Sequence, residues 1–87
     1  MSERGAGTEN GTMTVLDLPR HRWARVDRVE GEDTLCRRLL EMGFTPGECI
    51  RLVAAAPFHN PVAVNLRGTV FALRDNEAFC LKVCLME

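Results

Sequence analysis

The run that begins at Leu35 constrains the fold more than any other part of this sequence. Leu35, Leu39 and Met42 recur at the i, i+4 and i+7 spacing of one helical face. Gly43 follows at once, and glycine readily adopts the left-handed conformation that ends a helix. The pattern therefore predicts a single short amphipathic helix over residues 33–42.

The residues on either side of this helix predict how the chain enters and leaves it. Asp33 is expected to cap the first turn, where a carboxylate meets unpaired N–H groups and the positive end of the helix dipole. Pro46 and Gly47 suit the two central positions of a type II turn. Because a helix of about ten residues is only marginally stable alone in water, it must pack against the rest of the chain.

Short stretches of alternating hydrophobicity before and after the helix predict strands. The alternation is cleanest where Val62, Val64 and Leu66 share one face, and in the last stretch Phe79 is expected to point inward. The predicted strands cover residues 23–29, 49–54, 62–66, 69–73 and 79–84, with one helical turn over 74–78. The alternation slips at Arg28 and Val29, which predicts either a bulge or the end of the strand there. Together with the inserted helix they predict a mainly β fold, a small five-stranded barrel whose closure protects most strand edges.

The composition is that of one small soluble domain. The 87 residues, 46% of them hydrophobic, allow a single compact unit. Residues 1–12 are polar and glycine-rich, which predicts a disordered tail ahead of a domain that spans 13–87. Leaving out Arg4, Glu3 and Glu9, the 11 basic and 12 acidic residues become ten of each, so no basic footprint for nucleic acid is expected. No apolar run is long enough to cross a membrane.

The cysteines predict neither a disulfide framework nor a metal centre. They show no Cys-x-x-Cys spacing and no secretory signal precedes them. Cys80 and Cys84 are expected about 13 Å apart on one strand, and the spacing of His21 and His59 does not demand a metal either. We interpret all the cysteines as free buried or edge thiols: Cys36, Cys49, Cys80 and Cys84.

Motifs for catalysis are missing from the sequence. It contains no glycine-rich phosphate loop, and its only serine, Ser2, lies in the tail. Glu30, Glu32 and Asp33 cluster at the helix start, where capping explains them. A barrel of this size also leaves little room for a catalytic cleft. We therefore predict that the chain is not an enzyme and that it acts by recognition.

Several segments, in their order and spacing, resemble the ferrous iron transport protein A family, FeoA. The resemblance extends from Met13 to Val83. It rests on Met13–Pro19, Arg38–Gly47, Ala56–Pro61, Leu66–Gly68 and Phe71–Arg74. The family fold is an SH3-like barrel with an inserted helix, which agrees with the elements predicted above.

The resemblance implies a non-catalytic accessory protein that binds the cytosolic part of the ferrous iron permease FeoB. Such a protein is expected in the cytoplasm, peripheral at the inner membrane through the permease, with no required cofactor. Helices that end at a surface and apolar residues on loops are common contact sites. We predict that the helix end and the 56–61 loop contact the partner through Arg38, Leu39, Met42, Phe44 and Phe58.

Two other functions stay open at the level of the sequence. The chain could correspond to the C-terminal regulatory domain of an iron-dependent transcriptional repressor, which shares the barrel. It could also be a small metal-binding protein, with weak Fe(II) or Zn(II) binding at His21, His59 and the thiols. The absent basic patch disfavours the first function, and the ligand spacing disfavours the second.

Overall fold

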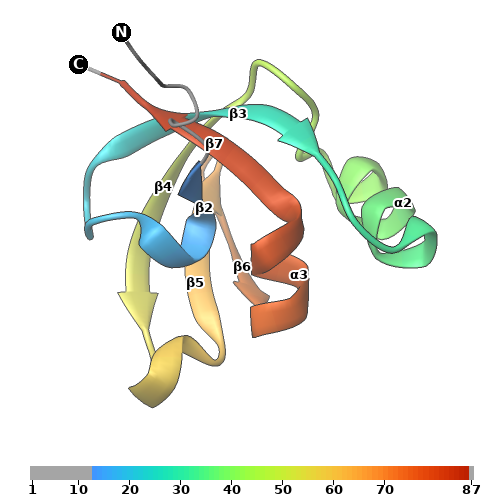
Figure 1. Ribbon diagram of the computed structural model, residues 1–87. Helices are drawn as coiled ribbons and strands as arrows, with labels where there is room; N and C mark the ends of the chain where they lie inside the picture. Colours follow the sequence, from blue (N-terminus) through green and yellow to red (C-terminus); the bar gives the residue numbers. More distant parts are fainter. Residues whose placement is uncertain (1–12, 87) are drawn as a thin grey trace, which may run out of the picture.

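The computed structural model describes residues 13–86 (Figure 1). Its strands are β2 (Met13–Thr14), β3 (Trp23–Val29), β4 (Cys49–Ala55), β5 (Val62–Leu66), β6 (Thr69–Leu73) and β7 (Leu81–Leu85). Its helices are α2 (Asp33–Met42) and α3 (Asp75–Cys80), with short 3-10 turns η1 (Val15–Asp17) and η2 (Pro57–His59). The predicted tail, residues 1–12, lies outside the described residues.

All six strands belong to one antiparallel sheet in the order β2-β7-β3-β4-β5-β6. The five predicted strands are present, and β2 adds a sixth that pairs Met13 with Val83 and Thr14 with Lys82. The sheet curls into a barrel (Figure 1). No ladder joins β2 to β6 within residues 13–86, and at this seam α3 packs against η1 and β2.

Two irregularities bend the strands around the barrel. The register of β3 on β7 shifts between Val26 and Arg28, so the predicted irregularity is a bulge. A second shift, between Leu52 and Ala54, interrupts the pairing of β4 with β5. Bulges increase local twist, so both shifts help a short sheet to curl.

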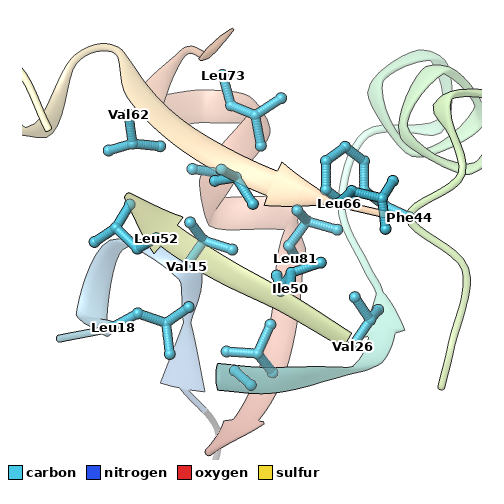
Figure 2. Close-up of a cluster of buried hydrophobic side chains, with 14 of the residues drawn as sticks. Val15, Leu18, Val26, Phe44, Ile50, Leu52, Val62, Leu66, Leu73 and Leu81 are labelled. Carbon is cyan, nitrogen blue, oxygen red and sulfur yellow. The ribbon is translucent and has the colours of Figure 1, made fainter. Parts of the chain in front are cut away.

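The core fills the inside of this curled sheet (Figure 2). Inward residues alternate along the strands, as Val62, Val64 and Leu66 do on β5. Phe44 and Leu39 enter the same cluster from the α2 side and are fully buried. The remaining large buried side chains are Ile50, Leu52, Leu73, Leu81, Val15, Val26 and Val83.

Helix α2 has the predicted bounds but a different N-cap. The Glu32 carboxylate, and not that of Asp33, accepts a hydrogen bond from the Leu35 N–H at 3.0 Å. Glu32 keeps the extended backbone of a capping residue, whereas Asp33 is already the first helical residue. At the other end Gly43 adopts the predicted left-handed conformation with φ 112°.

The turn after α2 is the predicted one. The Glu48 N–H donates to the Thr45 carbonyl at 3.1 Å, and Gly47 has φ 96°. These are the closing bond and the positive φ of a type II turn. The chain thereby reverses into β4.

The prediction was wrong at the start of the last strand. Residues 79 and 80 belong to α3, so Phe79 is 58% exposed while Cys80 is buried. A helical residue turns about 100° from its neighbour instead of 180°, which moves Phe79 out of the core. The Glu77 carboxylate accepts from the Arg74 N–H at 2.8 Å and stabilises the start of this helix.

Candidate protein-interaction surfaces

The five predicted contact residues occupy three different environments. Leu39 and Phe44 have no exposed surface, so they cannot touch a partner in the folded protein. Both side chains pack into the core of the barrel and thereby hold α2 against the sheet. Arg38 is exposed and Met42 is half-buried at the end of α2, while Phe58 is 96% exposed on η2.

A furrow runs between α2 and β6, and we call it the α2–β6 groove. One hollow of about 380 Å³ lies between Leu35, Arg38 and Met42 of α2 and Ala72 of β6. A second hollow of about 250 Å³ lies between Met42 and Phe71 of β6. The two hollows meet at Met42, so this side chain is at the centre of the groove.

Ion pairs flank both ends of the groove. At one end the Arg67 guanidinium donates to both carboxylate oxygens of Glu48, through Nε at 2.9 Å and through Nη2. This hydrogen bond lowers the pKa of the Glu48 carboxyl below its usual range. At the other end Arg38 Nη2 lies 3.6 Å from Glu77 Oε2. Each arginine is exposed, which is typical of a polar rim.

The floor of the groove is supported from beneath. Phe44 packs edge-to-face on Phe71, with ring centroids 5.4 Å apart and planes at 65°. Such pairs contribute about 0.5–1.5 kcal/mol beyond their buried area. Phe44 and Leu39 therefore fix the shape of the groove without lining it.

The second surface is the turn that carries Phe58, residues 56–61, which we call the Phe58 turn. Phe58 has φ 63° and ψ 20°, a left-handed conformation that side chains rarely adopt. Two backbone hydrogen bonds close the turn, from the His59 N–H to the Ala56 carbonyl at 2.9 Å and from the Ala56 N–H to the Pro61 carbonyl at 3.0 Å. The aromatic ring is thus held in solvent on an ordered backbone.

The two surfaces do not meet. Figure 1 places the 57–59 turn and α2 at opposite ends of the barrel. Phe58 instead borders a separate hollow of about 550 Å³ with Leu18, Leu52 and Ala55. The two segments predicted to contact the partner, the helix end and the 56–61 loop, therefore form two separate surfaces.

Sequence reasoning missed an arrangement on the outer face of the sheet. The Arg51 guanidinium stacks 4.9 Å from the centre of the Trp23 ring, and strand register places Asn65 and Val70 in the same row. Trp23 is 43% and Val70 56% exposed. The signal was available, since the outward positions of β3 and β4 can be read from their alternation.

Metal ligands do not gather in the part of the chain that the structure describes. Within residues 13–86 no group of three or more His, Cys, Asp or Glu side chains could hold an ion. His21 and His59 are exposed and lie on different turns. The cysteines are free thiols. No helix among these residues is long and apolar enough to cross a membrane.

Comparison with known proteins decides the family. The FeoA domain family matches residues 13–84. The chain belongs to the FeoA family. FeoA proteins act in ferrous iron transport. A curated relative from Porphyromonas gingivalis joins an FeoA part and an FeoB transporter part in one chain. That protein, an Fe(2+) transport protein A/Fe(2+) transporter FeoB fusion, is 36% identical over 74 residues, which are 85% of this chain but 9% of the relative.

Solved structures agree with this assignment and with the barrel. The chain is 41% identical to FeoA of Stenotrophomonas maltophilia, determined in complex with zinc, with a TM-score of 0.72 over 82% of this chain and 88% of that one. That FeoA is described as a prokaryotic SH3 domain protein and a candidate activating factor of ferrous iron transport. The SH3-like fold implied by the sequence is thus confirmed.

The same barrel occurs in a manganese-dependent transcriptional repressor. The TM-score is 0.78 over 92% of this chain and 48% of the repressor, at 14% sequence identity. At this identity the likeness concerns the fold alone. It explains why the sequence left a repressor domain open as an alternative, and it assigns no DNA-related role to this chain.

Proposed function

We propose that this FeoA-family chain is a non-catalytic accessory protein that binds the cytosolic part of the ferrous iron permease FeoB. The fusion relative supports the association, because it carries the two proteins as one polypeptide. The proposal places the chain in the cytoplasm, at the membrane only through its partner. It requires no cofactor.

The observation that carries the proposal is the state of Phe58. Leaving an aromatic side chain in water forgoes roughly 1.5–3 kcal/mol of burial, and a left-handed backbone costs a further 1–2 kcal/mol or so. Phe58 has both features, with 96% of its surface exposed and φ 63°. Strained residues cluster at binding sites, where a partner offsets their cost. We infer that Phe58 is the aromatic anchor for the permease.

The α2–β6 groove is the second contact in this proposal. Met42 supplies an adaptable apolar centre, and Arg38 lies on the rim, where charges guide association more than they add affinity. Contacts at opposite ends of the barrel suit a partner that wraps around it or meets it with two separate segments. Of the five predicted residues, Phe58, Met42 and Arg38 stay in the proposed interface.

The test measures the affinity of the purified chain for the soluble cytosolic domain of FeoB by calorimetry, with and without nucleotide. Phe58→Ala is expected to weaken binding about ten-fold or more, because a buried aromatic anchor is typically a hot spot. Phe79→Ala is the matched control, since it also removes an exposed phenylalanine but from α3. Circular dichroism confirms that both variants are folded.

Two results would contradict the proposal in different ways. If the wild-type chain does not bind the FeoB domain at all, the partner is wrong. If the wild type, Phe58→Ala and Phe79→Ala all bind the FeoB domain with the same affinity, the Phe58 turn is not the contact.

A further inference from the structure

Strand β6 forms an edge of the sheet. The sheet ends at β6, whose only strand partner within residues 13–86 is β5. The hairpin that joins the two strands has a two-residue loop, with φ 54° at Arg67 and 84° at Gly68, as in a type I′ turn. Because Leu66 and Thr69 close this loop as a hydrogen-bonded pair, every second residue of β6 from Thr69 onward bonds to β5.

This alternation leaves the backbone groups of Val70 and Ala72 without a partner strand. Thr69, Phe71 and Leu73 direct their N–H and C=O groups to β5, so those of the two residues between them point away from it. No other group in the described part of the chain forms a hydrogen bond with them. The edge therefore presents donors and acceptors in the pattern that an added strand would use.

The edge lacks the features by which proteins usually protect such strands from pairing. Between Thr69 and Leu73 it carries no proline, no charged side chain and no bulge. Its threonine, valine and phenylalanine instead favour an extended backbone, and Val70 is exposed. An edge strand of this kind is a template for pairing with another chain.

The α2–β6 groove lies along this edge. Thr69 and Phe71 line the groove from one face of β6, and Ala72 lines it from the other. Because successive side chains of a strand point to opposite faces, a groove lined from both faces borders the edge. Met42 lies on the opposite, helical wall. An extended chain in the groove would thus pair with β6 on one side and contact Met42 on the other.

The charges around the edge favour a segment of another protein over a second copy of this chain. Arg67 precedes β6 and Arg74 follows it. If the β6 strands of two copies paired antiparallel, Arg67 of each copy would lie near Arg74 of the other, and like charges across a ladder are destabilising. Arg74 is exposed and forms no ion pair within residues 13–86. A carboxylate at that end of an added strand would supply one.

We propose that β6 is a strand-addition site for one extended segment of the cytosolic part of FeoB. The segment is apolar at its centre, is acidic at the end beside Arg74, and pairs with the backbone of Val70 and Ala72. Extended peptides bind in this way to exposed sheet edges in PDZ and PTB domains. The inference rests on the proposed function and adds how the partner is recognised. Backbone pairing supplies affinity, while Met42 and Arg74 select the side chains.

Amide hydrogen exchange, followed by NMR on the full chain with and without the soluble cytosolic domain of FeoB, tests the pairing residue by residue. In the free chain the Val70 and Ala72 amides should exchange fast, whereas the Phe71 and Leu73 amides, bonded to β5, should exchange slowly. A saturating amount of the FeoB domain is expected to slow exchange at Val70 and Ala72 by about ten-fold or more.

Ala72→Pro tests the hydrogen bond itself. Proline removes the N–H at the free edge but no bond to β5, so an edge strand tolerates it. The variant is expected to bind the FeoB domain about five-fold more weakly. Ala72→Val keeps the N–H and is the matched control, with a change of about two-fold or less. If the proline variant does not fold, amide exchange in the wild type decides alone.

A charge reversal tests the chemistry of the segment. Arg74→Glu should weaken binding more than Arg74→Gln, because only the first places a carboxylate opposite the acidic end of the added strand. Equal effects of the two variants would overturn the acidic character of the segment.

The outcomes separate this inference from the proposed function. If the FeoB domain does not bind the wild type, the proposed partner is wrong and strand addition to it is wrong as well. If the domain binds but the Val70 and Ala72 amides still exchange fast, or Ala72→Pro and Ala72→Val bind equally, strand addition alone is overturned. Protection of these two amides in the chain by itself, growing with its concentration, would show that a second copy pairs with β6 instead.

Discussion

The Phe58 turn and the α2–β6 groove reach the surface by opposite physical routes. The groove is supported by the core, since Leu39 and Phe44 beneath it are fully buried. The Phe58 turn buries little of its own and is shaped by two backbone hydrogen bonds and a left-handed residue. The shape of the α2–β6 groove is therefore determined by side-chain packing, and the shape of the Phe58 turn by the backbone.

This difference predicts how each surface responds to mutation. Changes beneath the groove act on stability first and on binding only through it. Changes at the Phe58 turn leave the core intact, so they act on binding first. A pair of surfaces with such separable responses allows folding and recognition to be tested independently.

The largest effect is expected for Leu39→Ala. Removing a fully buried leucine typically costs about 2–5 kcal/mol, because the transfer free energy is lost and a cavity remains. Chemical denaturation measures this loss, and Leu40→Ala on the exposed side of the same helix is the control, since Leu40 is 41% exposed. Equal losses for the two variants would mean that α2 is not docked as described.

Phe58→Gly separates the strain at the turn from the contact it makes. Both Phe58→Ala and Phe58→Gly remove the ring, but only glycine adopts φ 63° without a Cβ penalty. The glycine variant is expected to be more stable than the alanine variant by about 1 kcal/mol. Both should bind FeoB equally weakly. If alanine is the more stable variant, the backbone there is not left-handed.

Arg38→Ala tests the rim of the groove and is expected to have a smaller effect. The Arg38–Glu77 pair is solvent-exposed on the arginine side, and exposed pairs contribute about 0–1 kcal/mol. We expect FeoB affinity to fall about threefold or less, mainly through a slower association rate. Arg37→Ala, one residue along the same helix, is the control. An effect on affinity as large as that of Phe58→Ala would reverse the ranking of the two surfaces.

Much of the fold could be predicted because its periodicities are local. The bounds of α2, β5 and β6 follow directly from spacing and turn residues, and each is as predicted. Strand β2 was missed because two residues carry no alternation. Phe79 was misplaced because a six-residue helix and the start of a strand look alike over so short a stretch.

The contact residues could be predicted only in part, since exposure depends on what packs on each face. Periodicity shows that Leu39 and Met42 share a stripe but not that Leu39 lies at its buried centre. Phe58 stood out because a phenylalanine between two prolines has few ways to be buried. Its distance from α2 depends on the course of the whole sheet, which local patterns do not encode.

The smallest effect is expected at the Arg67–Glu48 pair, and it concerns pH. Arg67 lowers the pKa of the Glu48 carboxyl, so the charged form is favoured by folding. Its stabilisation is complete above the ordinary carboxyl pKa of 4.5 and is lost as pH falls through the lower folded value. Thermal unfolding of the wild type and of Glu48→Gln should therefore differ slightly at neutral pH and converge in acid. A difference that grows on acidification would show that the carboxyl is stabilised in its protonated form, contrary to the observed ion pair.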